Sequence, residues 1–187
     1  MLQNTPIILA SKSPRRQELL KLMGLNFKVE LKDVDESYPE DLSPAEIAVY
    51  ISEKKAKAFS ADEEIVITAD TIVALNGEIL GKPNDKAHAQ EMLRKLSGSK
   101  HEVYTGVTLV QGGKKISFYD VTEVSCKVVT DTEIDFYIDN YKPYDKAGSY
   151  GVQDWWGIVV VEKINGSYTN VMGLPTEKLY NELLKLI

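Results

Sequence analysis

The chain has 187 residues, of which 43% are hydrophobic and 27% are charged, proportions typical of an ordinary globular protein. Its formal net charge of -6 argues against a general nucleic-acid binder, because such proteins neutralise phosphates with a basic face. The longest apolar runs are far shorter than the roughly 18 residues of a membrane span. The N-terminus lacks the regions of a signal peptide, and the single cysteine, Cys126, excludes an intramolecular disulfide. We therefore expect a cytoplasmic protein with neither a membrane nor a nucleic-acid partner.

Hydrophobic periodicity and turn residues predict an alternation of strands and helices. Apolar runs predict strands over residues 5–10, 25–31, 64–75, 103–110, 116–129 and 158–164. Amphipathic patterns predict helices over residues 14–23, 44–60, 85–96, 130–141 and 176–187. Residues 142–157 are rich in Gly, Tyr and Asp and are expected to form a functional loop or a mixture of loop and strand.

Capping and turn signals set several of these boundaries. Residues 43–46, Ser-Pro-Ala-Glu, form a capping box with proline at the first helical position. The Asn-Gly pair at residues 76–77 predicts a hairpin turn, and the Gly-Gly pair at residues 112–113 joins two long strands. Helices mixed with strands that look antiparallel favour an α/β fold with a mixed sheet.

The stretch LASKSPRR, residues 9–16, gathers cations and hydroxyl groups where a strand turns into a helix. Such a turn presents backbone N–H groups and the positive end of the helix dipole, to which Ser11, Arg15 and Arg16 add donors suited to phosphate oxygens. Cations in a first helical turn cost up to about 1 kcal/mol each, a cost that a bound polyanion would reverse. The sequence therefore favours an anion site over its alternative, a solvated turn with surface cations.

Asp70 ends an apolar run, and Lys82 follows shortly after the predicted hairpin turn. An acid at the end of a buried strand lies where open α/β sheets place their ligands. One acid among several cations suits metal-assisted chemistry at phosphate, because the carboxylate can bind Mg²⁺ or orient water. A capped turn or a surface ion pair is an equal alternative for Asp70 alone.

The segment DKAGSYGVQ, residues 145–153, combines glycines with a terminal amide. Glycine allows the backbone to approach a ligand closely, and Gln153 can both donate and accept hydrogen bonds, as recognition of a base requires. A glycine-punctuated turn into a strand fits the same residues.

Four spaced stretches match one family in order. They are SKSPRR (11–16), ADTIV with LGKP (69–83), MLRKLSGSKHEVYTGV (92–107) and YDKAGSYGVQ with NGSYTNVMGLP (144–175). With these motifs the chain resembles a Maf-family nucleoside triphosphate pyrophosphatase over nearly its whole length.

The resemblance implies a single Maf-like domain over residues 1–187. Its fold would be a mixed twisted sheet with flanking helices, in two lobes around a central cleft, similar to that of inosine triphosphate pyrophosphatases. It further implies hydrolysis of the α–β phosphoanhydride of a nucleoside triphosphate to a monophosphate and pyrophosphate. The implied cofactor is a divalent cation, Mg²⁺ or else Mn²⁺, and the implied assembly is a homodimer.

The resemblance also assigns roles to individual residues. Asp70 would accept a proton from the attacking water, and Glu36 and Asp70 would face the metal. The residues implied to contact the triphosphate are Ser11, Arg15, Arg16, Lys55 and Lys82. The combination of Arg15, Thr71 and Gln153 resembles the branch of the family that prefers dTTP and UTP, with modified pyrimidine triphosphates as further candidate substrates. An amide suits such a base, since it can pair with a carbonyl and the adjacent imide N–H.

Several assignments have structural alternatives. Lys55 lies in a run of lysines that fits a solvated helix face, and Glu36 fits a loop surface equally well. Residues 155–156, Trp-Trp, replace the glycine expected after Gln153; core packing is favoured over a base pocket or a partner surface. His88 and His101 have no neighbours at metal-site spacing and are expected to be structural.

A rival function uses the same anion site. A nucleotide-binding regulatory protein of cell division would hold the triphosphate with little turnover. Asp70 speaks against it, because an acid does not favour triphosphate binding unless a metal intervenes.

Overall fold

The computed structural model describes residues 2, 5–60 and 62–187. Within these residues the strands are β1 Ile7–Leu9, β2 Phe27–Val29, β3 Ile65–Leu75, β4 Glu78–Leu80, β5 Lys100–Gln111, β6 Lys114–Cys126 and β7 Val161–Asn165. The α-helices are α1 Pro14–Leu22, α2 Pro44–Ala56, α3 Lys86–Leu96, α4 Asp131–Tyr141, α5 Trp155–Val159, α6 Tyr168–Met172 and α7 Thr176–Leu183. Two 3₁₀ turns, η2 Pro143–Asp145 and η3 Ala147–Ser149, follow α4.

The described strands form one mixed sheet in the order β2-β1-β3-β5-β6-β7, with β4 also paired to β3. β1 runs parallel to both β2 and β3, whereas β3 and β4 form the antiparallel hairpin that the Asn-Gly turn predicts. The expected mixed sheet is therefore confirmed.

The chain divides into two compact units. Unit 1 consists of Met1–Thr71, Thr105–Asp120 and Gly173–Ile187, and unit 2 of Ile72–Tyr104 and Val121–Met172. Strands β3, β5 and β6 contribute residues to both units.

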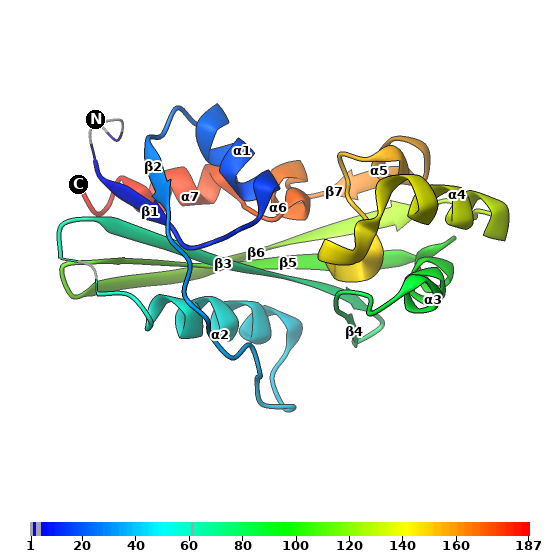
Figure 1. Ribbon diagram of the computed structural model, residues 1–187, viewed down its shortest axis with the longest axis horizontal. Helices are drawn as coiled ribbons and strands as arrows, with labels where there is room; N and C mark the ends of the chain where they lie inside the picture. The colour runs from blue at the N-terminus through cyan, green and yellow to red at the C-terminus, as the bar shows by residue number, and fades with distance from the viewer. Residues whose placement is uncertain (1, 3–4, 61) are drawn as a thin grey trace. The chain divides into compact units, whose positions relative to one another are not determined.

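Unit 1 buries β1 and most of β3 between helices. Figure 1 shows α2 on one face of β1 and β3, and α1 and α7 on the other. A strand covered on both faces needs apolar residues at consecutive positions. Ile65, Val66 and Ile67 of β3 accordingly have no exposed surface.

Gly106 of β5 brings α2 close to the sheet. A Cβ atom at Gly106 would lie only 2.3 Å from the carbonyl carbon and oxygen of Ala48, which belongs to the second turn of α2. The backbone of α2 thus rests directly on β5, a contact that no residue other than glycine permits. This contact fixes the height of α2 above β5, the neighbour of the strand β3 that carries Asp70.

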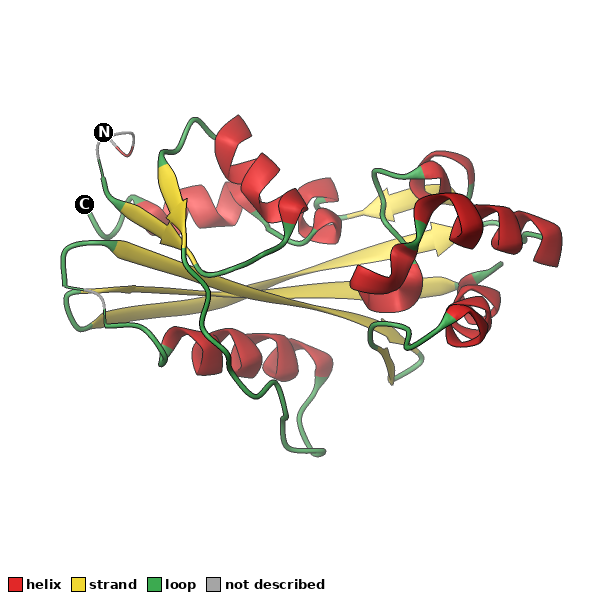
Figure 2. Cartoon of the chain, viewed as in Figure 1, coloured by secondary structure: helices red, strands yellow, loops and turns green. Residues whose placement is uncertain are grey.

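Unit 2 is built around aromatic side chains. α3 and α4 lie side by side (Figure 2), and Tyr137 of α4 and Trp156 of α5 are completely buried, with ring centroids 5.6 Å apart. The burial of Trp156 supports core packing for that residue. Cys126, at the end of β6, is also buried, and burial raises the pKa of its thiol to about 11. Its thiol is therefore protonated at neutral pH, as a structural cysteine should be.

His101 is a buried member of unit 2 whose Nε2 atom lies 2.7 Å from the Tyr150 hydroxyl. Burial lowers the pKa of His101 from 6.5 to about 4. The unfolded chain therefore binds a proton between pH 6.5 and 4 that the folded chain excludes, so stability falls as the pH falls through this window.

The free energy of unfolding should decrease by up to about 3 kcal/mol between pH 6.5 and 4, because His101 resists protonation in the folded chain. Urea titrations of the wild type and of His101→Gln at several pH values measure this loss. The His101→Gln protein should lose less stability across the window, because glutamine can bond Tyr150 without titrating. Parallel losses in the two proteins would contradict the assignment.

The structure corrects several predicted element boundaries, most of them near the C-terminal end of the chain. The strand expected over residues 158–164 is wrong in its first part, where α5 Trp155–Val159 is helical and β7 begins at Val161. A short apolar run has no period that separates strand from helix. The short helix α6 was not predicted, and α2 and α7 end earlier than expected, at Ala56 and Leu183. None of the described helices has the length and apolar character needed to cross a membrane.

Candidate active site

The turn from β1 to α1 is ordered by its own serines. Ser13 caps α1 by accepting a hydrogen bond from the Arg16 backbone N–H at 3.4 Å, and Pro14 occupies the first helical position. The Ser11 hydroxyl in turn accepts from the Ser13 N–H at 3.3 Å. The first turn of α1 carries no acidic residue, so its positive dipole is not offset locally. The turn therefore has the backbone geometry and charge of an anion site.

Arg16 points inward from this turn and is only 9% exposed. Its guanidinium donates four hydrogen bonds: Nε to the Gly173 carbonyl at 2.8 Å, Nη1 to the Ala69 carbonyl at 2.9 Å and to Ser11 Oγ at 3.2 Å, and Nη2 to Thr71 Oγ1 at 3.0 Å. Burial lowers the pKa of Arg16, and the negative charge of Asp70 acts against this effect. An arginine nevertheless keeps its charge in a protein.

These bonds bear on the expected role of Arg16, which stays a prediction. A guanidinium has five N–H donors, and four of them are directed at protein oxygens. The fork-like contact with a triphosphate that the sequence predicts for this residue would need two. Arg16 instead ties α1 to β3 and to the segment after α6. Arg15, half-buried one position earlier, remains the better candidate for a phosphate contact.

Thr71 Oγ1 accepts the hydrogen bond from Arg16 Nη2 and lies 3.0 Å from Thr105 Oγ1 on β5. The threonine expected to contribute to substrate preference is thus held from two sides. Thr105 and Gly173 lie within the family motifs, but no role was predicted for them, because both act through contacts that are distant along the chain.

Asp70 lies between Ala69 and Thr71 on β3, and its side chain reaches α2. Lys55 Nζ, on α2, is 2.7 Å from Asp70 Oδ1 and 2.9 Å from Glu36 Oε1. The side chains of Lys55 and Asp70 are 17% and 14% exposed, whereas that of Glu36 is 51% exposed. The structure therefore brings together three of the residues singled out in the sequence, and Lys55 pairs with two carboxylates instead of lying on a solvated face.

A buried polar contact helps to hold α2 over this part of β3. Thr68 Oγ1 donates to the Ser52 carbonyl of α2 at 2.7 Å, and the Ser52 hydroxyl is 2.8 Å from that of Thr108 on β5. Ser52, Thr68 and Thr108 have no exposed surface, so these bonds form in a medium of low dielectric. These bonds hold α2 at Ser52, one turn before Lys55, and the close approach at Gly106 holds it nearer its start.

Asp70 and Glu36 have the chemistry expected of Mg²⁺ ligands. Carboxylate oxygens are hard donors, and Mg²⁺ is commonly held by one or two carboxylates together with substrate phosphates. Across residues 2, 5–60 and 62–187, no group of three or more His, Cys, Asp or Glu residues could hold a metal ion by itself. A pair of carboxylates that share one lysine fits a metal that binds with its substrate.

The other two predicted site residues, Lys82 and Gln153, belong to unit 2. Lys82 is exposed in the segment after β4. Gln153 lies in a turn fixed by Tyr137, whose hydroxyl accepts a hydrogen bond from the Gly151 N–H at 3.0 Å and donates one to Asp154 at 3.2 Å. Within the described part of the chain, Gln153 Oε1 is buried without a hydrogen-bond partner. The roles of Tyr137 and Asp154 were not predicted, since a tyrosine inside an amphipathic helix looks like an ordinary core residue and its partner Asp154 looks like a loop residue.

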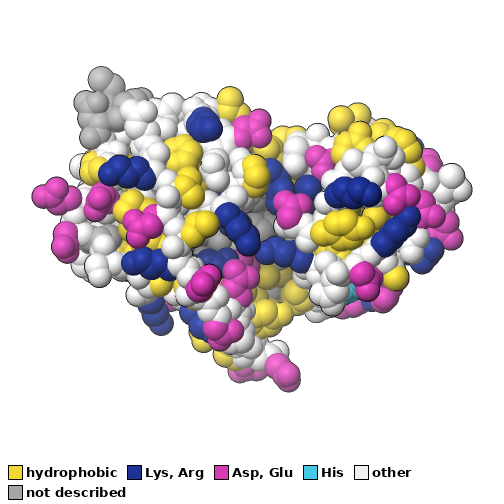
Figure 3. All heavy atoms as spheres, in the orientation of Figure 1, with side chains coloured by type: hydrophobic (Ala, Val, Ile, Leu, Met, Phe, Trp, Pro, Cys, Tyr) yellow, Lys and Arg dark blue, Asp and Glu magenta, His cyan; other side chains and the backbone are white. Residues whose placement is uncertain are grey.

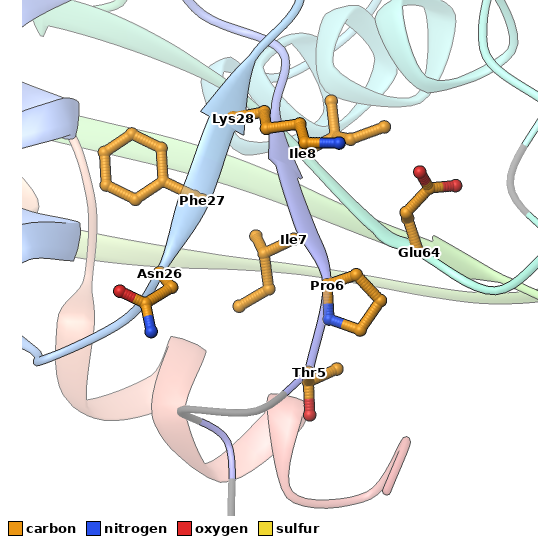
Figure 4. A pocket seen from close by; sticks show the side chains of 8 residues that line it. All are labelled: Thr5, Pro6, Ile7, Ile8, Asn26, Phe27, Lys28 and Glu64. Carbon is orange, nitrogen blue, oxygen red and sulfur yellow. The ribbon is translucent and has the colours of Figure 1, made fainter.

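One pocket of the described residues lies away from the predicted site residues. A pocket of about 300 Å³ lies beside β1 and β2 (Figure 4), and none of the predicted site residues lines it. On the face shown in Figure 3, lysine and arginine side chains are interspersed with acidic ones.

Comparison with known proteins places the chain in a family. The family model for Maf-like proteins matches residues 6–186. A protein of Cytophaga hutchinsonii named dTTP/UTP pyrophosphatase is 51% identical over 187 residues, covering 99% of this chain and 86% of the relative. A protein of the same name from Bacteroides thetaiotaomicron is 52% identical over 184 residues, covering 96% of this chain and 95% of the relative.

Solved structures show the same fold. The Ham1 protein of Staphylococcus aureus superposes with a TM-score of 0.53 at 18% identity, covering 95% of this chain and all of that one. The HAM1 protein of Coxiella burnetii has the same TM-score at 17% identity, covering 97% and 99% of the two chains. This similarity confirms the predicted inosine triphosphate pyrophosphatase-like fold. Because a family model matches nearly the whole chain and relatives are about half identical to it, this chain is a member of the Maf family.

Proposed function

We propose that this chain hydrolyses dTTP and UTP, and modified pyrimidine triphosphates of the same type, to the nucleoside monophosphate and pyrophosphate. The observation that carries the proposal is the carboxylate of Asp70, held on β3 by Lys55 and next to the strand residues that Arg16 binds. The names of the half-identical relatives supply the substrate class.

Asp70 acts as the general base in this proposal. Its carboxylate accepts a proton from the water that attacks the α-phosphorus, and pyrophosphate leaves. A positioned base contributes about 10²- to 10⁴-fold to a rate. The side chain is 14% exposed and is fixed on a buried strand, so water can reach a carboxylate whose position is set.

The cationic turn binds the phosphates. Ser11 and Arg15 lie at the start of α1, where the backbone N–H groups and the helix dipole favour negative charge. Arg16 keeps this turn in place by bonding Ser11 and the carbonyl of Gly173. Lys82 is proposed as a further phosphate contact, and Gln153 and Thr71 as the groups that select the base.

A divalent cation, Mg²⁺ or Mn²⁺, would be held by Asp70 and Glu36 and would neutralise charge on the triphosphate and on the departing pyrophosphate. Lys55 is the chain's own cation at this point, 2.7 Å from Asp70. The carboxylates, the lysine and the cationic turn together provide groups for both the attack and the binding of charge.

A panel of nucleotides tests this function. The protein should convert dTTP and UTP with Mg²⁺ to monophosphate and pyrophosphate, with kcat/KM values at least about tenfold above those for CTP, GTP and ATP, in line with a discrimination of about 1–3 kcal/mol by a paired side-chain contact to a base. Chromatography of both products measures this. Preference for another base would overturn the roles of Arg15, Thr71 and Gln153. Tight binding of dTTP without any turnover would favour the regulatory protein instead.

A further inference from the structure

We propose that Lys55 competes with the divalent cation for Asp70 and Glu36, so that the nucleotide-free protein binds metal weakly and the metal enters with the substrate. The inference rests on the proposed function, because it assigns the same carboxylates to metal binding. The inference goes beyond that function because it gives Lys55 two roles in succession. Lys55 first opposes metal binding, and after the metal has bound it contacts a phosphate.

The geometry points to a shared position. Lys55 comes from α2, Asp70 from β3 and Glu36 from the segment before α2, yet one ammonium group lies 2.7 Å and 2.9 Å from the two carboxylates. Two carboxylates this close to one point repel each other unless a cation lies between them. The ammonium therefore contacts both of the carboxylates that would hold the cation.

The charges favour exchange. One ammonium between two ionised carboxylates leaves an excess of one negative charge, which a divalent cation removes completely. A lysine side chain is a flexible four-carbon stem with a point charge, so Lys55 can move to a phosphate oxygen when a metal takes its place. Arg16 cannot exchange in this way, because four hydrogen bonds to protein oxygens hold it.

The neighbouring lysine provides a matched control. Lys54 precedes Lys55 on α2, but its Nζ atom bonds Asp35 at 2.8 Å and the Ser37 carbonyl at 3.0 Å. Substitution of Lys54 removes the same charge from the same helix turn without freeing Asp70 or Glu36. A general change in the protein's electrostatic field therefore affects both variants, whereas local competition affects only Lys55.

Binding of Mn²⁺ without nucleotide tests the proposal. Free Mn²⁺ would be titrated by electron paramagnetic resonance against the wild type, Lys55→Met, Lys55→Gln and Lys54→Met. Both Lys55 variants should bind Mn²⁺ about tenfold more tightly than the wild type, since a competing charge at a partly exposed site has been removed. Lys54→Met should match the wild type, and Asp70→Asn combined with Lys55→Met should lose the gain.

Unchanged Mn²⁺ affinity in the Lys55 variants would overturn the inference. If folded Lys55→Met or Lys55→Gln binds Mn²⁺ no more tightly than the wild type, or if Lys54→Met gains as much, Lys55 does not compete with the metal and the inference fails. The titration involves no turnover, so its failure differs from that of the proposed function, which would appear as a wild-type protein that does not convert dTTP.

Discussion

The Asp70→Asn protein should hydrolyse dTTP about 10²- to 10⁴-fold more slowly than the wild type, the contribution of a general base, while it still binds the nucleotide. Asparagine has nearly the shape of aspartate but cannot accept the proton of the attacking water. The cationic turn at the start of α1 is unchanged by the substitution. Steady-state kinetics give the loss in kcat, and calorimetry with a non-hydrolysable dTTP analogue gives the affinity.

Asp35→Asn is the matched control for this substitution. Asp35 also bonds a lysine of α2, at 2.8 Å from Lys54 Nζ, but its side chain is 71% exposed. The control should keep a kcat close to that of the wild type. An Asp70→Asn protein that retained more than about a tenth of the wild-type kcat would show that Asp70 is not the base.

The Arg16→Met protein should be less stable than the wild type by about 3 kcal/mol or more, because four hydrogen bonds are lost and two buried carbonyl oxygens, those of Ala69 and Gly173, lose a donor. For a chain of this length that loss lowers Tm by about 10 °C. Differential scanning fluorimetry measures the shift. Turnover should fall as well, since Ala69 and Thr71 flank Asp70 on β3.

Arg15→Met separates positioning from phosphate binding. It removes the same charge one residue earlier, where the side chain is only half-buried, and should raise KM for dTTP while Tm shifts by no more than a few degrees. The reverse pattern, an Arg16→Met protein with unchanged Tm and a raised KM, would restore Arg16 to its expected place on the triphosphate.

The contrast between these two arginines shows where the sequence stops being informative. Both are cations in the first turn of a helix, and their spacing gives them the same expected role. Successive residues point about 100° apart around a helix, so one faces the interior while the other stays near the surface. Only the fold brings Gly173, which is 157 residues away, to the buried guanidinium. Lys54 and Lys55 differ for the same reason, one bonding an exposed acid and the other the partly buried Asp70.

Local signals gave the most accurate predictions. The capping box at Ser43 and the Asn-Gly turn depend on neighbours in sequence, and α2 and the β3–β4 hairpin begin where these residues indicate. The prediction was wrong at α5, because its apolar residues fit a strand equally well. Gly157 explains the difference: a Cβ there would lie 1.7 Å from the Val152 carbonyl oxygen, a close approach that belongs to a compact turn.

The measurement that tests the central claim most directly is hydrolysis of dTTP in ¹⁸O-labelled water, with both products analysed by mass spectrometry. Attack of water on the α-phosphorus places the label in dTMP and leaves pyrophosphate unlabelled, and we expect this result. Label in pyrophosphate would mean attack on the β-phosphorus, and release of single phosphate would mean cleavage of a different bond. Either of these results would contradict the proposed reaction at Asp70.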